Sequence, residues 1–93
     1  MMKLWWFSGE SGLREMIFAE TEERASDLYA EVLIMSCAPA TKYWGREIAE
    51  DAVVPEHREH YRNAVSRNQE GFGELDPQRG WRIISLAERI ERL

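Results

Sequence analysis

Hydrophobic positions near the start of the chain recur in short blocks that fit β-strands. Residues 3–7 and about 13–20 are rich in aromatic and aliphatic side chains, and a turn-forming Ser-Gly-Glu-Ser-Gly segment separates them. This arrangement predicts an antiparallel hairpin. Because Trp5, Trp6 and Phe7 place large apolar groups on both faces of the first strand, we expect that strand to be inner or covered.

The hydrophobic period then changes to that of a helix. Thr21 can cap the first turn, and Glu22 and Glu23 lie where the helix dipole favours negative charge. Pro39 cannot continue a helix, which predicts a helix over about 22–37. We expect this helix and the strand before it, residues 13–37, to organise the fold through an apolar face made by Ala25, Leu28, Tyr29, Val32 and Met35.

Weaker patterns follow the first helix. Residues 42–48 predict a third strand, and Gly45 within it indicates a bulge or a close backbone approach. Pro55 suits the first position of a second helix that extends to about Asn68. The apolar face of this helix is thin, so we expect it to lie on the surface and to pack modestly.

The end of the chain predicts a second hairpin. Strands at 72–75 and 80–85 flank an Asp-Pro-Gln-Arg-Gly turn. Ser85 and Glu88 have the spacing of a capping box, which favours a short helix over 86–93. The alternative is a strand that continues to Ala87, followed by a frayed tail.

The elements therefore follow the order β-β-α-β-α-β-β, with an optional C-terminal helix. This order predicts an α+β two-layer sandwich, in which helices pack on one face of a mainly antiparallel sheet. The pattern leaves the order of the strands in the sheet open. A chain of 93 residues predicts one small domain spanning residues 1–93, with little room for a deep cofactor cavity.

Composition narrows the setting. Hydrophobic residues make up 44% of the chain and charged residues 31%, which is typical of a globular protein. No apolar run approaches the roughly 20 residues that a membrane-spanning helix needs. Cys37 is the only cysteine and cannot form an internal disulfide, so we expect a reducing, cytoplasmic setting and a small, buried, inert side chain.

The net charge of −5 is unevenly distributed along the chain. Residues 1–36 carry −4, whereas residues 61–93 carry +1. Glu20, Glu23, Asp27 and Glu31 recur at spacings of three and four, which predicts an acidic strip along the first helix. Arg24 is the i+4 partner of Glu20 and offsets part of the repulsion. Such a strip is most often a solvated face, but it can also dock on a basic protein.

Aromatic residues supply the second half of the predicted binding surface. The four tryptophans are too many for so small a domain to bury easily, and exposed tryptophans are good interface anchors. We therefore predict a non-enzymatic protein-binding module that uses the acidic strip with Trp44 and Trp81. Its partner would be a protein with a basic surface.

Catalytic and metal signatures are weak. His57 and His60 share one face of the second helix, with Glu56 nearby, but the spacing differs from H-E-x-x-H, and Arg58 would place positive charge beside a cation. We expect an ordinary solvated helix there. No dinucleotide-binding glycine pattern, phosphate-binding loop or nucleophile elbow occurs. The sequence therefore predicts no enzyme activity, no cofactor and no metal.

Two alternatives stay open. The C-terminal half mixes Phe72 and Trp81 with arginines in a way that could bind nucleic acid, although acidic residues nearly cancel the charge. These arginines are Arg62, Arg67, Arg79, Arg82, Arg89 and Arg92, of which the last two can pair with Glu88 and Glu91. A homodimer that buries Trp5, Trp6 or Trp81 is the second alternative.

Taken as a whole, the small size, the acid-rich front, the α+β order and the lack of a catalytic signature resemble the single-domain accessory proteins of phages and mobile elements. Anti-CRISPR proteins are the best-known inhibitors in that group. The resemblance covers the general character of the chain and no particular motif. It implies an inhibitor that docks on a nucleic-acid-handling protein complex.

Overall fold

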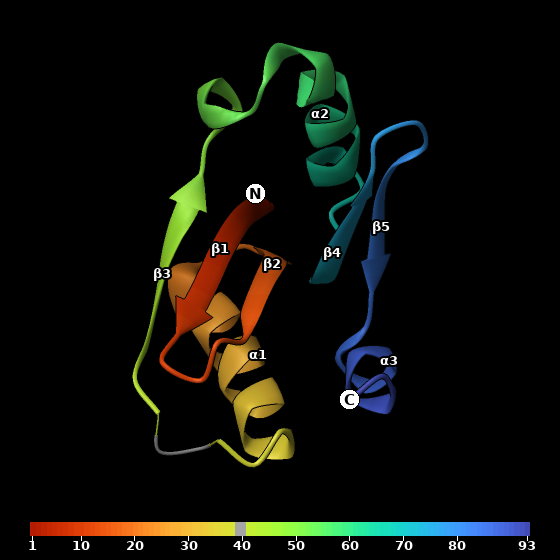
Figure 1. The fold of residues 1–93 in the computed structure, drawn as a ribbon. Coiled ribbons are helices and arrows are strands. Elements are labelled where there is room, and N and C mark those ends of the chain that lie inside the picture. The colour runs from red at the N-terminus through yellow and green to blue at the C-terminus, as the bar shows by residue number, and fades with distance from the viewer. Residues whose placement is uncertain (39–40) are drawn as a thin grey trace.

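The computed structural model describes residues 1–38 and 41–93 (Figure 1). The strands are β1 (Lys3–Gly9), β2 (Arg14–Ala19), β3 (Tyr43–Ile48), β4 (Gly71–Asp76) and β5 (Gly80–Ile84). The helices are α1 (Glu22–Met35), α2 (Arg58–Ser66) and α3 (Leu86–Glu91), and short 3₁₀ turns at Glu50–Ala52 and Pro55–His57 precede α2. The order confirms the predicted α+β fold, including the C-terminal helix.

The strands form one five-stranded sheet in the order β3-β1-β2-β4-β5, and all neighbouring pairs are antiparallel. Strand β1 is an inner strand, as its apolar side chains on both faces predict. The pairing of β2 with β4 is short and consists of Ile17 opposite Phe72 and Phe18 opposite Gly71. Beyond these pairs the two strands diverge, and Figure 1 shows the sheet opening between them above α3.

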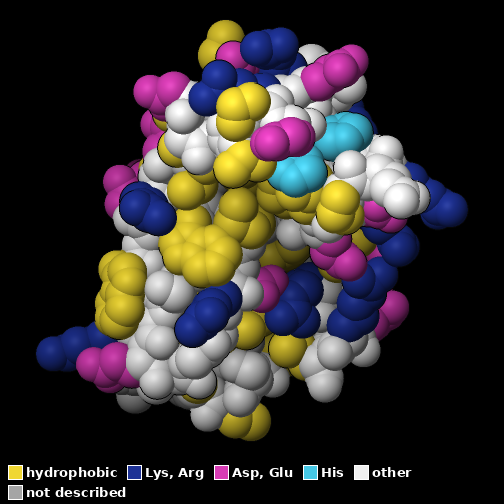
Figure 2. Space-filling model, turned by 45° about the horizontal axis from the view of Figure 1, so that its top comes forward, with side chains coloured by type: hydrophobic (Ala, Val, Ile, Leu, Met, Phe, Trp, Pro, Cys, Tyr) yellow, Lys and Arg dark blue, Asp and Glu magenta, His cyan; other side chains and the backbone are white. Residues whose placement is uncertain are grey.

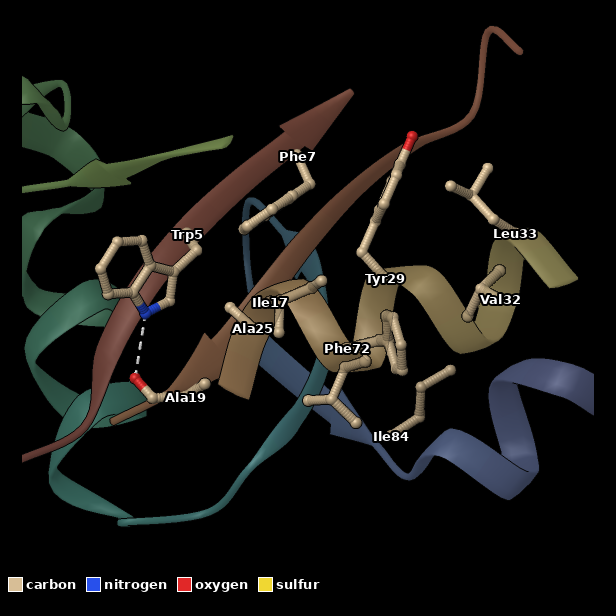
Figure 3. Close-up of a cluster of buried hydrophobic side chains, with 11 residues drawn as sticks. Trp5, Phe7, Ile17, Ala19, Ala25, Tyr29, Val32, Leu33, Phe72 and Ile84 are labelled. Carbon is tan, nitrogen blue, oxygen red and sulfur yellow. Dashed lines mark hydrogen bonds between the residues drawn. The ribbon is translucent and has the colours of Figure 1, made fainter. Parts of the chain in front are cut away.

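Helix α1 covers one face of the sheet and creates the larger core (Figure 3). Alternate side chains of the strands point toward it, and Leu86 of α3 packs against the same cluster. The Trp5 indole Nε1–H donates a hydrogen bond of 3.1 Å to the Ala19 carbonyl within this core. The apolar face of the helix therefore has the predicted role. The buried members are Trp5, Phe7, Ile17, Ala19, Ala25, Leu28, Tyr29, Val32, Leu33, Phe72 and Ile84.

Helix α2 packs on the opposite face, because its core partners are the strand residues of the other parity. Tyr61 and Ala64 are buried there, whereas the pattern had placed all the helices on one face. Phe18 and Trp81 meet edge to face, with ring centroids 5.2 Å apart. The second cluster consists of Met2, Leu4, Phe18, Tyr61, Ala64, Trp81 and Ile83. Helix α2 therefore buries more of its apolar face against the sheet than the modest surface packing expected from its sequence.

The ends of α1 show why the helix has these bounds. The Thr21 hydroxyl accepts a hydrogen bond of 3.1 Å from the Arg24 N–H, which confirms the predicted cap. At the other end Cys37 is left-handed, with φ of 63°. The N–H groups of Cys37 and Ala38 donate to the carbonyls of Ile34 and Leu33, which is a Schellman motif. Pro39, predicted to end the helix, lies outside the described residues.

Two expectations about α1 are wrong. Met35 is 52% exposed, and Leu33 takes the core position instead. Cys37 is exposed rather than buried, and it lies in the left-handed turn beyond the last helical residue. Met35 therefore lies on a solvent-facing side of the helix, whereas Leu33 before it and Ala38 after it pack against the core.

Candidate protein-binding surface

The predicted acidic strip is exposed on the outer side of α1. Glu23, Asp27 and Glu31 lie one helical turn apart, and Glu20 precedes the helix cap. All four carboxylates are exposed, and none belongs to an ion pair within residues 1–38 and 41–93. The strip therefore presents four carboxylates to solvent that are not held in ion pairs with the described chain.

Arg24 does not offset Glu20 as predicted. Its guanidinium makes a bidentate pair with Glu70, at 2.8–3.0 Å, and so connects α1 to the segment before β4. The hydrogen bonds that Arg24 donates to Glu70, together with the negative charge of that carboxylate, raise the pKa of Arg24. The guanidinium of Arg24 is therefore committed to Glu70, and it makes no ion pair with Glu20.

Exposed aliphatic residues continue the strip at the C-terminal end of α1. Ile34 follows Glu31 by three residues on the same outer side and is 53% exposed, and Met35 is 52% exposed. Exposed aliphatic side chains beside charges that face solvent give a surface the two components of a protein interface. We call Glu20, Glu23, Asp27, Glu31, Ile34 and Met35 the α1 outer face.

The tryptophans predicted as anchors lie elsewhere. Trp44 is 57% exposed, but its neighbour Tyr43 is the residue of β3 that packs toward α1, so Trp44 points to the opposite face of the sheet. Trp81 is only 8% exposed and packs on Phe18 under α2. Trp5 is buried as well. The structure therefore separates the acidic strip from Trp44, and the burial of Trp81 leaves it no exposed ring to offer a partner.

The arginines of the C-terminal half are largely engaged within the fold. Arg62, Arg82, Arg89 and Arg92 form ion pairs with Glu50, Glu88, Glu15 and Glu74 respectively. Arg92 also contacts Glu88, and Arg67 donates to the Trp81 carbonyl at 2.7 Å. Phe72 and Trp81 are buried, so the aromatic groups of the predicted nucleic-acid surface cannot stack on bases.

The two histidines lie together at the start of α2, where Figure 2 shows them in cyan. Their rings stack with centroids 6.2 Å apart, and the His57 Nδ1 atom is buried without a protein hydrogen-bond partner. In the described part of the chain, no three His, Cys, Asp or Glu side chains gather as a metal site would require. The described helices also include none with the length and apolar character to cross a bilayer.

Two features of the molecular surface, one on α1 and one on the opposite face of the sheet, were not predicted from the sequence. Ile34 is an apolar residue that falls outside the predicted apolar face of α1, and this position in the helix could have indicated that its side chain is exposed. The second feature is a hollow of about 300 Å³ lined by Trp6, Trp44, Gly45 and Arg46, which depends on strand pairing that the sequence leaves open. Comparison of the chain with protein-family models, curated proteins and solved structures found no significant match in any of the three.

Proposed function

We propose that this protein is a non-enzymatic binding module that docks its α1 outer face on a basic surface of a partner protein. The observation that carries the proposal is the run of exposed carboxylates outside ion pairs that ends in exposed Ile34 and Met35. Carboxylates steer an encounter with a basic partner, and aliphatic anchors add burial once contact is made. Neither feature is needed for the packing of α1 on the sheet.

The energetic argument supports a role outside the fold. Glu23, Asp27 and Glu31 repel one another at i,i+4 spacing, which costs a few tenths of a kcal/mol per pair. Ile34 and Met35 expose apolar area that burial would stabilise. A basic partner would relieve both costs at once.

The partner class follows from the charge pattern. A row of carboxylates along a helix can occupy a groove that otherwise holds a phosphate backbone. We propose a nucleic-acid-handling protein as the partner and competitive inhibition as the outcome, in the manner of anti-CRISPR inhibitors. The lone Cys37 is compatible with a reducing compartment, and we place the interaction in the cytoplasm.

Charge reversal on α1 tests the proposal. Proteins recovered from a host lysate by the wild-type chain would be purified and their affinity measured for wild type and for the triple variant Glu23→Lys, Asp27→Lys and Glu31→Lys. We expect the variant to lose at least about tenfold in affinity and the wild-type interaction to weaken with salt. We also expect nucleic acid to compete with wild type.

The control is a variant with the same change in net charge placed outside α1, Glu56→Lys, Glu59→Lys and Glu91→Lys. These glutamates are exposed and lie outside the ion pairs of the described chain. It should bind like wild type, and equal binding by the α1 triple variant would refute the proposal. A low-salt gel shift with single-stranded and duplex oligonucleotides tests the arginine-based alternative, for which we expect no shift.

A further inference from the structure

The outer edge of β3 presents unused backbone hydrogen-bonding groups. The Glu10 N–H donates to the Lys42 carbonyl at 2.9 Å, and the β1–β3 register then runs without a bulge. Hydrogen-bonded residues alternate along an antiparallel pair, so Trp44 and Arg46 bond to β1. Tyr43, Gly45 and Glu47 must therefore direct their N–H and C=O groups away from the sheet. In Figure 1, β3 forms one margin of the molecule.

The opposite edge of the sheet is protected. On β5, the carbonyl of Trp81 accepts a hydrogen bond of 2.7 Å from Arg67, and the carbonyl of Ile83 accepts one of 3.3 Å from Gln69. Both donors come from the segment between α2 and β4, which lies along that edge. Side chains that cap an edge strand in this way block its pairing with another strand. Within the described residues, no side chain caps the outward groups of Tyr43, Gly45 and Glu47 in the same manner.

We propose that β3 is a self-association edge, on which a second copy of this chain adds its own β3 antiparallel about a two-fold axis at Gly45. Each outward N–H then meets a carbonyl of the other copy, because Tyr43 pairs with Glu47 and Gly45 pairs with itself. The two sheets join into one continuous sheet. This addition of a strand to an exposed edge is a common mode of protein association.

The side chains favour this register over its neighbours. With the axis at Gly45, Trp44 of each copy lies opposite Arg46 of the other, which is a cation–π pair. Moving the two-fold axis by one residue slides the strands by two residues and keeps the bonding phase. It places Lys42 opposite Arg46 when the axis is at Trp44, or Arg46 opposite Arg46 when the axis is at Arg46. Like charges directly opposite one another destabilise a strand pair, so of these three registers only the Gly45-centred one avoids repulsion.

The surface beside the edge also lacks a partner. Trp44 is 57% exposed, and it lines the hollow of about 300 Å³ with Trp6, Gly45 and Arg46. Figure 2 shows hydrophobic and basic side chains gathered together on the face opposite α1. In the proposed pairing, Trp44 of the second copy lies over Arg46 and beside this hollow. The association would cover the exposed indole and leave both α1 outer faces free, so it does not rest on the proposed function.

Sedimentation velocity over a wide range of protein concentration, with amide hydrogen exchange at both extremes, tests the pairing. We expect a reversible monomer–dimer equilibrium. In the dimer, the amides of Tyr43, Gly45 and Glu47 should exchange about tenfold more slowly when nine-tenths of the chain is associated. The amides of Trp44 and Arg46 already bond to β1 and should not change. A protein that stays monomeric overturns the proposal, as does a dimer without this alternating protection.

Matched variants at Glu47 separate the backbone contribution from that of the side chain. Glu47→Pro removes an N–H that makes no bond inside the monomer, and an edge strand tolerates proline at such a position. Glu47→Ala loses the same side chain, including its contact with Lys3, but keeps the N–H. We expect the proline variant to be monomeric and the alanine variant to dimerise, with far-UV circular dichroism confirming that both are folded. Equal association of the two folded variants overturns the proposal.

Trp44→Ala tests the side-chain part of the interface. It should raise the dimer dissociation constant by about tenfold or more, because buried tryptophans dominate such contacts. Val54→Ala is the control, since Val54 is similarly exposed at 53% but is not part of β3. An unchanged constant for Trp44→Ala would overturn the proposed register.

Discussion

The ion pair between Glu15 and Arg89 holds the C-terminal helix against the opening between β2 and β4. Arg89 of α3 donates to Glu15 of β2 through Nε at 2.6 Å and Nη2 at 3.1 Å. The two side chains are only 19% and 9% exposed, respectively, and they line a cleft of about 300 Å³. The hydrogen bond to Glu15 raises the pKa of Arg89. This geometry predicts that Arg89→Met will be costly, because it leaves the Glu15 carboxylate buried without its partner.

The magnitude follows from burial. Breaking a fully buried pair by removing one partner costs about 3–5 kcal/mol. Arg89 retains some solvent contact and Arg92 lines the same cleft, so we expect about 2–3 kcal/mol here. A chain of this length has a free energy of unfolding of roughly 5–14 kcal/mol, so the loss is a large share. The double variant Glu15→Met/Arg89→Met removes the stranded charge and should cost less than about 1 kcal/mol.

Urea unfolding followed by tryptophan fluorescence and far-UV circular dichroism measures these differences, provided that the m-values agree. Arg82→Met is the control, because the Arg82–Glu88 pair is exposed and should contribute at most about 1 kcal/mol. If Arg89→Met costs no more than Arg82→Met, the reasoning is refuted. A double variant that is as unstable as the sum of its single variants would refute it as well.

Two further predictions concern the core around α1 and α2. Gly45→Ala should lower the free energy of unfolding by at least about 2 kcal/mol in thermal or urea unfolding, because the Cβ of the new alanine would lie 2.4 Å from the Phe7 ring. Adding Phe7→Leu to this variant should recover part of the loss. If the costs of the two substitutions are purely additive, the explanation is contradicted. Burial raises the pKa of both Tyr29 and Tyr61 above the model-peptide value of 10.0, so these hydroxyls ionise at lower pH in the unfolded chain than in the folded one. The two neutral tyrosines therefore stabilise the fold below pH 10, and this contribution is lost as the pH rises through the folded pKa values. Urea unfolding between about pH 8 and pH 11 should show this loss, and a flat profile would count against it.

Much of the fold was predictable because local patterns carry it. The caps at Thr21 and Ser85 are read from single side chains that bond to nearby backbone, and both hydrogen bonds are present in the structure. The apolar periodicity likewise indicates strands near β1 and β2 and the length of α1 within two residues. Boundaries failed where backbone geometry competes with periodicity, as in the left-handed turn at Cys37.

The candidate site depended on pairings that no local pattern determines. The acidic strip was visible in the sequence because its residues share one helix, and the structure places all four carboxylates in solvent. The loss of Arg24 to Glu70 and the pairing of Arg89 with Glu15 join residues far apart in the chain, where the sequence offered only nearby partners. Trp44 and Trp81 look alike as isolated residues, and only tertiary packing decided which one is exposed.

The sequence alone determined the type of most helices and strands, and it determined the charge of the α1 outer face. Both follow from the spacing of residues along a single element. Tertiary structure decided the strand order, the packing of α2 on the second face of the sheet and the open edge at β3. The physical reason is that strand pairing and burial depend on contacts between residues distant in sequence. Hydrophobic spacing predicts that a side chain will be buried, but it does not predict which other side chains it will contact.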